Sequence, residues 1–348
     1  MLYPDDIPFV QGLDLCERFF FDIVKPLLDE YYPSLDYVAC RLGEGSDVLG
    51  FDTNQSRDHD WGPKFDLLLE NDHYINELNT FLNKHLQGKS ICGYSTQFQR
   101  FNEQDGRITL INISNDQENT SHDWLTFPSQ HLLTIAQGRV FHDSDRLNMK
   151  HIRWQLAYYP KDVWLYLIGC CWQRIGQEEH LMGRAGQAED ELGSAIIASR
   201  LVRDLMRLVF LLEKQFYPYA KWFGTAFRRC TTNGSDLEPI LRQVQLTKTW
   251  QEREHQLNLA YERLAILTKE KLSDIIDFTK FNMNTEITQF HNRPFRIING
   301  GAIADIIFAQ IENLQIRQLP RIGSIDLFID STDAMFPELR LKMKKLFQ

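Results

Sequence analysis

The sequence lacks the motifs that mark several common classes of enzyme. Its six cysteines form no Cys-x-x-Cys pair and lie in mostly apolar stretches, so we expect buried thiols of a reducing compartment. No HExxH, Walker A or Gly-x-Ser-x-Gly motif occurs, and Gly43, Gly45 and Gly50 do not form the dinucleotide-binding fingerprint. Redox, zinc-protease and serine-hydrolase functions are therefore without support.

Long apolar runs and an excess of positive charge are also missing. The longest uncharged apolar run, residues 163–172, is about half of the roughly 20 residues that span a bilayer. The first residues show no basic segment followed by an apolar one, as a secretory signal would. A net charge of -9 and a pI near 5.6 disfavour a large surface for duplex nucleic acid. We expect a cytoplasmic protein that binds neither membranes nor duplex nucleic acid.

The composition, with 43% hydrophobic and 24% charged residues, is that of a globular protein, and 348 residues suffice for two domains. The patterns in the first part predict an α/β domain with a mixed sheet over residues 1–150. Helices are expected at 12–31 and 73–86, and strands at 37–42, 57–69, 97–101, 107–114 and 138–142.

After about residue 150 the pattern changes to long stretches of 3.6-residue period with charged outer faces. These predict a helical bundle domain over residues 151–348. The expected fold class is therefore α+β. The predicted helices are 164–182, 189–216, 236–246, 250–271 and 302–313.

Two aspartates, Asp58 and Asp60, fall within the predicted strand 57–69. Side chains alternate along a strand, so these two carboxylates would point to one face and His59 to the other. Two close carboxylates repel each other unless a cation lies between them, and oxygen ligands of this kind suit Mg²⁺ bound to substrate phosphates. The pair predicts a magnesium–triphosphate site with Asp58 and Asp60 as metal ligands.

Gly45 and Ser46 follow the preceding predicted strand. Glycine lets the backbone approach a ligand closely, and a serine hydroxyl with neighbouring N–H groups can bind phosphate oxygens. Arg57 and Arg41 are candidates for further phosphate contacts, although either could be a solvated charge at a strand end. The Gly-Ser turn therefore complements the predicted metal site.

Leu42-Gly43-Glu44-Gly45-Ser46, followed after eleven residues by Asp58-His59-Asp60, resembles the signature of the polymerase-β-like nucleotidyltransferase superfamily. The two-domain plan resembles the kanamycin and lincosamide nucleotidyltransferases. Segments 56–63, 219–227 and 323–333 also resemble a full-length bacterial family of that superfamily. The resemblance implies Mg²⁺-dependent transfer of a nucleoside monophosphate from a nucleoside triphosphate to a hydroxyl of a small-molecule acceptor, and it suggests a homodimer.

The general base is not evident, because the predicted strand 108–113 contains no acid. Asp116 and Asp143 flank strands, where an acid more often serves as a turn or cap residue. The kanamycin-type resemblance directs attention to an acid of the helical domain, and Glu179, followed by Glu178, is the candidate; charged clusters on helices otherwise form solvated faces.

Lys221, among aromatic residues, is a candidate triphosphate contact or else a lysine whose stem packs on those rings. Three hypotheses remain open at this stage. The chain is an active enzyme on a small molecule, a protein- or RNA-modifying nucleotidyltransferase, or a catalytically inactive nucleotide-binding protein of the same fold.

Overall fold

The computed structural model describes residues 7–58, 61–69, 72–96, 108–112, 121–144, 148–329, 339 and 342–347. The chain forms two compact units, residues 1–118 with 131–157 and residues 119–130 with 158–348. Residues 131–157 of the first unit therefore follow residues 119–130 of the second unit along the chain. The domain boundary that the sequence suggests at residue 150 stays a prediction.

The first unit opens with the helical segment that the sequence predicts over residues 12–31. It consists of α1 (Gly12–Phe19), the π-helical turn η1 (Phe20–Val24) and α2 (Lys25–Tyr31). The π-helical turn brings Phe20 and Val24 into the core together with Phe19. The segment is therefore one helical rod with a widened turn at its centre.

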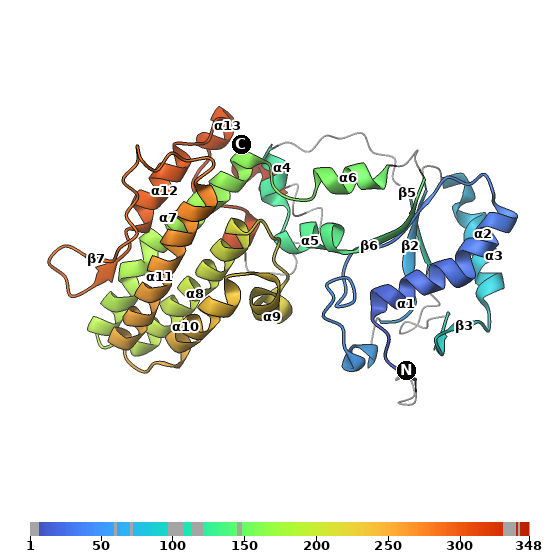
Figure 1. Ribbon diagram of the computed structural model, residues 1–348, viewed down its shortest axis with the longest axis horizontal. Helices are drawn as coiled ribbons and strands as arrows, with labels where there is room; N and C mark the ends of the chain where they lie inside the picture. Colours follow the sequence, from blue (N-terminus) through green and yellow to red (C-terminus); the bar gives the residue numbers. More distant parts are fainter. Residues whose placement is uncertain are drawn as a thin grey trace. The chain divides into compact units, whose positions relative to one another are not determined.

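A four-stranded mixed sheet, of order β5-β2-β1-β6, forms the centre of this unit (Figure 1). The pair β1–β2 is antiparallel, with Cys40 opposite Asp66, and β2 runs parallel to β5 with Asp66 opposite Thr109. A bulge at Ala39 and Cys40 interrupts the antiparallel pair β1–β6. The strands are β1 (Val38–Arg41), β2 (Phe65–Leu69), β5 (Ile108–Asn112) and β6 (Arg139–Asp143).

The two faces of the sheet are covered differently. Alternate residues of β2, beginning with Phe65, pack on α1, η1, α2 and α3 (Ile75–Leu86) in one large apolar core. The opposite face carries Val38, Cys40 and Leu68, and Met149 of α6 (Met149–Gln155) packs on them. Figure 1 shows α1–α3 and α6 on opposite sides of the sheet. This second face has the thinner apolar cover.

Several short elements complete the first unit, and the sequence patterns did not predict most of them. The 3-10 turns are η2 (Asn54–Asp58) and η3 (Asp72–Tyr74), the small hairpin is β3 (Ser90–Ile91) with β4 (Tyr94–Ser95), and α5 (Ser129–Gln137) precedes β6. The strand predicted over 97–101 lies outside the described residues.

The second unit is a helical bundle, as the sequence predicts (Figure 1). Its long helices are α7 (Lys161–Gln187), α8 (Glu191–Leu212), α10 (Gly234–Leu246) and α11 (Trp250–Leu272). The shorter elements are α4 (Ser121–Thr126), α9 (Ala220–Cys230), α12 (Gly300–Phe308), α13 (Leu314–Arg317), α14 (Ile325–Phe328), η5 (Lys344–Phe347) and the hairpin β7 (Thr288–Gln289) with β8 (Arg296–Ile297).

The helix expected over 302–313 ends at Phe308, and the chain then turns into α13. The beginning of α12 packs very closely on α7. A Cβ atom at Gly176 would lie 2.4 Å from the backbone nitrogen of Gly301, and one at Gly300 would lie 2.7 Å from the carbonyl oxygen of Trp172. Glycine at these positions permits a backbone-to-backbone contact that no larger residue allows.

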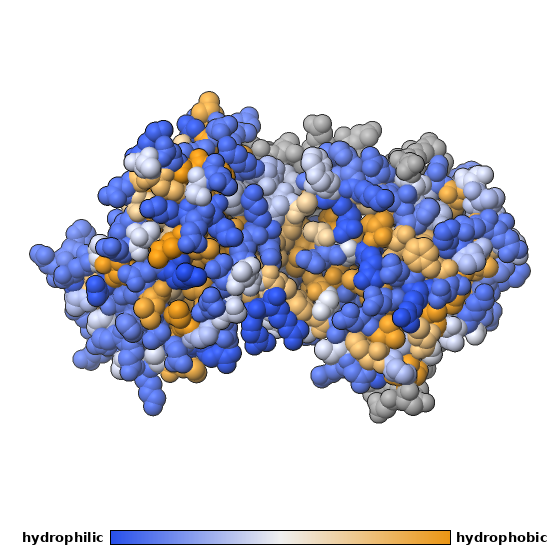
Figure 2. Space-filling model, in the orientation of Figure 1, coloured by the Kyte–Doolittle hydropathy of each residue, from blue (hydrophilic) through white to orange (hydrophobic). Residues whose placement is uncertain are grey.

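The mixed α+β fold class predicted from the sequence is confirmed. Among the described helices, none combines the length and apolar character needed to cross a membrane. Hydrophilic side chains cover most of the face that Figure 2 displays, with apolar patches between them. All six cysteines are free; Cys16, Cys40, Cys170 and Cys171 are buried, whereas Cys92 is half-buried and Cys230 is exposed, so the expectation of uniformly buried thiols was wrong for these last two.

Candidate functional site

The Gly-Ser segment forms a compact turn directly after β1. The Gly45 carbonyl accepts the N–H of Leu49 (3.3 Å), and the Ser46 carbonyl accepts that of Phe51 (2.9 Å). These bonds close overlapping tight turns over residues 45–51, and successive backbone N–H groups in such turns favour anions. Gly43 donates its N–H to the carbonyl of Thr134 in α5 (3.2 Å), which fixes the turn to the rest of the unit.

A buried ion pair shapes this turn from within. Arg41, the last residue of β1, binds both carboxylate oxygens of Asp47 (2.7 and 3.1 Å), and the two side chains are only 7% and 4% exposed. The same guanidinium donates to the carbonyl oxygens of Leu42 (2.7 Å) and Glu44 (2.8 Å). Arg41 thus organises the turn and is not a solvated charge, and its phosphate contact stays a prediction.

Gly45 is required by this packing. Its φ of +142° lies in a region that residues with a side chain rarely adopt. A Cβ atom would come within 2.0 Å of an Asp47 carboxylate oxygen and 2.7 Å of the Arg41 guanidinium. The glycine of the predicted phosphate-binding turn is therefore explained by the ion pair beneath it as well as by access for a ligand.

Two further buried polar groups hold the long connection from β1 to β2. The Asp52 carboxylate accepts the N–H of Gly12 at the start of α1 (2.7 Å) and the indole N–H of Trp61 (2.9 Å). Arg57 is 5% exposed and donates to the carbonyls of Ile7 (3.0 Å) and Asn54 (3.3 Å). Arg57 is therefore not a solvated charge, and its phosphate contact stays a prediction.

The strand expected over residues 57–69 begins only at Phe65, so the prediction that Asp58 lies on a strand was wrong. Asp58 is the last residue of the 3-10 turn η2. Two hydrogen bonds support this turn. The Ser56 N–H donates to the Thr53 carbonyl (2.8 Å), and the Thr53 N–H donates to the Ser56 hydroxyl (3.0 Å). Gly62, at φ +139°, adopts a conformation that residues with a side chain rarely take, three residues before the strand starts.

The Asp58 side chain, His59 and Asp60 lie outside the described residues. Their roles as magnesium ligands, and the alternation argument that paired them, therefore stay predictions. In the described part of the chain, no group of three His, Cys, Asp or Glu side chains is arranged to hold a metal ion. The predicted aspartate pair falls outside that search.

Asp66 is an acid of the sheet that the sequence patterns did not single out. It is the second residue of β2, it lies opposite Cys40 of β1, and by alternation it shares the sheet face of Val38, Cys40 and Leu68. Burial, and then the charge of Asp66, raises the pKa of the Cys40 thiol to about 12. Asp143, opposite Val38 in β6, is a second acid on this face, but its carboxylate caps α6. The alternating pattern of β2 could have revealed Asp66.

Asp143 serves as a helix cap, in line with the structural role that its position suggested. Its two carboxylate oxygens accept the N–H groups of Met149 (3.1 Å) and Lys150 (3.0 Å) at the start of α6. Asp116, the other acid beside a predicted strand, lies outside the described residues.

The two glutamates proposed as bases each have partners in the second unit. Glu179 is 3% exposed, and its carboxylate accepts the N–H groups of Ile298 (2.8 Å) and Gly300 (3.2 Å) where α12 begins. Glu178 forms an ion pair with Arg200 of α8. These contacts give Glu179 a role in joining α7 to α12, and catalysis by either glutamate stays a prediction.

The burial of Glu179 should make stability depend on pH. Burial raises its pKa from 4.5 to about 7, although the backbone N–H groups of Ile298, Gly300 and Asn299 act in the opposite direction. A carboxyl whose pKa is higher in the folded state contributes stability that is fully present below pH 4.5 and is lost as pH rises through 7. At about 1.4 kcal/mol per pKa unit, the contribution lost is on the order of 3 kcal/mol.

Urea unfolding of the wild type and of Glu179→Gln between pH 4.5 and 7.5 measures this effect. The difference in unfolding free energy between the two proteins should change by about this amount across the range. Glu189 is exposed, so Glu189→Gln serves as the control. Its unfolding free energy, plotted against pH, should run parallel to that of the wild type. Parallel profiles for Glu179→Gln as well would contradict a raised pKa at this position.

Lys221, the remaining predicted contact, is exposed on the first turn of α9. Its ammonium group lies 5.1 Å from the ring centre of the adjacent Trp222, which fits the alternative of a lysine packed on an aromatic ring. The triphosphate contact stays a prediction for this residue.

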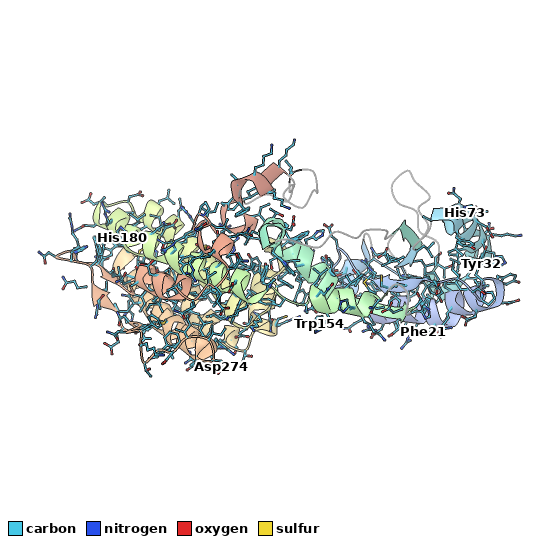
Figure 3. All side chains as sticks on the ribbon, turned by 90° about the horizontal axis from the view of Figure 1, so that it is seen from above. Phe21, Tyr32, His73, Trp154, His180 and Asp274 are labelled. Atoms are coloured by element: carbon cyan, nitrogen blue, oxygen red, sulfur yellow. The ribbon has the colours of Figure 1, made fainter. Side chains whose placement is uncertain are left out.

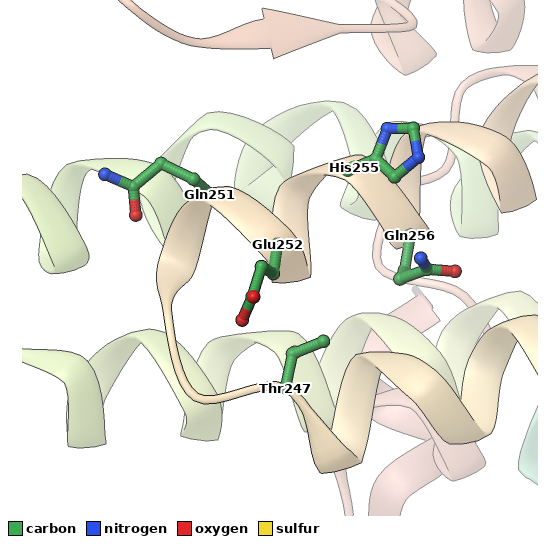
Figure 4. Close-up of a pocket in the computed structure, with 5 residues that line it drawn as sticks. All are labelled: Thr247, Gln251, Glu252, His255 and Gln256. Atoms are coloured by element: carbon green, nitrogen blue, oxygen red, sulfur yellow. The ribbon is translucent and has the colours of Figure 1, made fainter.

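A hollow of about 420 Å³ lies on the second unit where α10 leads into α11 (Figure 4). Its five lining residues are Thr247, Gln251, Glu252, His255 and Gln256. These side chains are polar, and all come from the second half of the chain, outside the set that the sequence singled out. The hollow therefore adds no residue to the candidate site at the Gly-Ser turn.

Residues 124–223 match the model of a family described as a domain of unknown function, DUF4037. No curated protein matches the chain. A solved structure, that of a nucleotidyltransferase-like protein from Exiguobacterium sibiricum 255-15, is similar with 9% sequence identity and a TM-score of 0.36; the match covers 79% of this chain and 96% of that one. The family match covers less than half of the chain and the structural likeness is distant, so the function has to be argued from the site's own residues.

Proposed function

We propose that this protein is a nucleotidyltransferase that moves a nucleoside monophosphate from a nucleoside triphosphate to a hydroxyl of a small-molecule acceptor. The observation that carries the proposal is the turn at Gly43–Ser46, which the buried pair Arg41–Asp47 holds at the end of β1. The antiparallel neighbour strand β2 begins beside it and brings Asp66 to the adjoining sheet face. An anion-favouring turn next to an acidic sheet face suits a metal-bound triphosphate.

Asp58 and Asp60 would hold Mg²⁺ in this proposal. Carboxylate oxygens suit this hard cation, and Asp66, the second residue of β2, would add a third oxygen donor. The bound ion would neutralise charge on the phosphates and align them for attack. Asp66 also offers the acid that β5 lacks, at a position where it could accept the acceptor's proton.

The chain's own groups account for the remaining requirements of the transfer. The N–H groups that follow Gly45, together with the Ser46 hydroxyl, would bind phosphate oxygens. The acceptor oxygen would form a bond to the α-phosphorus while the bond to pyrophosphate breaks, and the hydroxyl proton would pass to a carboxylate. Because little covalent chemistry falls to the protein, positioning of the phosphates by this fixed turn is its main contribution.

Incubation of the protein with α-labelled nucleoside triphosphate, Mg²⁺ and a cell lysate tests the proposal. We expect pyrophosphate release and transfer of label to a small molecule, both abolished by EDTA. Label on a protein or RNA would instead indicate a macromolecular acceptor. Failure of every nucleoside triphosphate to bind in the presence of Mg²⁺ would contradict the proposal.

One observation favours a second candidate, a catalytically inactive nucleotide-binding protein. β5 (Ile108–Asn112), the parallel neighbour of β2, contains no acid where related folds would place a third carboxylate. Binding of a triphosphate with Mg²⁺, without transfer to any lysate component, would support this candidate over the first.

A further inference from the structure

The outer face of α6 presents an aromatic and basic surface. Trp154, marked in Figure 3, is 74% exposed, whereas the other six tryptophans, all described, are buried or half-buried. His151, one helical turn earlier, lies against it with ring centres 5.8 Å apart and planes inclined by 26°. Lys150 is exposed beside them. An indole that contributes so little to the core is unusual, because tryptophan is mostly buried on average.

The attachment of α6 to the unit does not depend on this indole. Met149 packs on the sheet face formed by Val38, Cys40 and Leu68. Arg153, four residues later and therefore on the same side of the helix, donates to three backbone carbonyls at the end of α5. Met149 and Arg153 thus hold the inner side of α6, and Trp154 stays on the outer side.

The contacts of Arg153 connect Trp154 to the phosphate-binding turn. Arg153 binds the carbonyl oxygens of Ile135 (3.1 Å), Ala136 (2.7 Å) and Gly138 (2.8 Å). Thr134, the residue before Ile135, accepts the N–H of Gly43 (3.2 Å). The end of α5 is therefore bound on one side by the Gly43–Ser46 turn and on the other by the residue adjacent to Trp154.

Gly138 shows how closely these parts pack. A Cβ atom at this position would lie 2.3 Å from the carbonyl oxygen of Arg41 and 2.7 Å from a Leu42 side-chain atom. The segment that Arg153 clamps is thus in direct contact with the residues that enter the Gly-Ser turn. This close packing fixes the end of α5, to which Arg153 anchors α6, against the residues that lead into the turn.

We propose that Trp154 is the platform on which the base of the bound nucleoside triphosphate stacks while its phosphates lie at the Gly43–Ser46 turn. This inference rests on the proposed function and adds its base-binding subsite. His151 supports one side of the indole, and the open side receives the base. Stacking of this kind accepts any base, because every base has a π-face.

The same chemistry could serve a single-stranded RNA acceptor, but the observations favour the nucleotide. One stacked pair offers room for one base, and its connection through α5 leads to the turn where the triphosphate is proposed to bind. A strand of RNA would need further aromatic and basic groups along its path, whereas the chain as a whole carries a net charge of -9.

Binding measurements on the full chain with two probes test the proposal. Mg²⁺-ATP carries a base, whereas Mg²⁺-tripolyphosphate carries only the phosphates. Trp154→Ala should raise the Kd for ATP by about 5- to 150-fold, the range for loss of one base–aromatic stack, and leave the Kd for tripolyphosphate unchanged. Trp154→Phe should restore most of the affinity. Ile152→Ala, which truncates an exposed neighbour on the same helix, is the matched control and should bind both probes as the wild type does.

Each other outcome identifies what has failed. If the wild type binds ATP and Trp154→Ala binds it equally well, the base platform is wrong and the proposed function is unaffected. If the variant loses tripolyphosphate affinity to the same extent, Trp154 acts on the fold of the turn, and the platform is again wrong. Weaker binding of a single-stranded RNA oligonucleotide with unchanged ATP affinity would assign the surface to RNA. Absence of binding of both probes to the wild type would overturn the proposed function and the platform together.

Discussion

Replacement of both Asp58 and Asp60 by asparagine is expected to lower Mg²⁺-dependent nucleotidyl transfer about 10³-fold, because metal-ion stabilisation of charge in the transition state contributes several kcal/mol. The substitution keeps the size of both side chains and removes the charges that would hold the metal. Pyrophosphate release with saturating nucleoside triphosphate measures the effect. The stability of the folded chain without Mg²⁺ should stay the same or rise, since two neighbouring carboxylates repel each other in the absence of a cation.

Asp22→Asn combined with Glu30→Gln is a suitable control, because it removes two exposed negative charges from the same unit. This variant should keep the activity of the wild type. Full Mg²⁺-dependent activity in the double asparagine variant would show that the metal, if needed, is held elsewhere. In that case Asp66 would be the next carboxylate to replace.

Asp47→Ala is expected to destabilise the protein by about 3–5 kcal/mol, since it leaves the guanidinium of Arg41 buried without its partner. That loss is a large part of the total stability of a typical protein. It should also release the turn at Gly45, where Arg41 binds the Glu44 carbonyl. Unfolding in guanidinium chloride, followed by circular dichroism, gives the change in free energy.

The exposed pair Lys25–Asp29 provides the matched comparison. Asp29→Ala should change the free energy of unfolding by no more than about 1 kcal/mol, as is usual for solvent-exposed ion pairs. The double variant Arg41→Met with Asp47→Leu should be less destabilised than Asp47→Ala, because no charge is left buried. A loss under 1 kcal/mol in Asp47→Ala would mean that Arg41 finds another partner when Asp47 is removed.

The sequence was informative about long periodic elements and much less so about segments shaped by single polar contacts. The helices α7, α8, α10 and α11 follow from their long apolar patterns. Helices α10 and α11 each bury one stripe, whereas α7 is buried on every side over residues 163–172. Several short helices escaped prediction, among them α5 and α6. The first turn of α6 is capped by Asp143, and Arg153 fixes that helix to the end of α5. Such contacts between single polar groups leave no periodic signal.

The candidate site shows the same limit. The Gly-Ser turn was placed correctly after β1, because glycine and serine next to a short apolar strand favour a turn. The strand predicted to contain Asp58 begins eight residues later than expected, at Phe65. The residues before it include Gly62 and Pro63, which are rare in strands, and local hydrogen bonds between Thr53 and Ser56 support a 3-10 turn. The partner of Arg41 could not be foreseen either, since ion pairing depends on how the turn folds back.

The return of residues 131–157 to the first unit means that the two units are interleaved along the chain. Strand β6 pairs with β1, so a fragment ending at residue 118 would expose β1 as an unpaired edge, a known cause of aggregation. A cut at residue 150 would instead divide α6. No single cut therefore yields both units whole, and a gene fusion that exchanged one of them for a homologous part would need three junctions, at 118/119, 130/131 and 157/158.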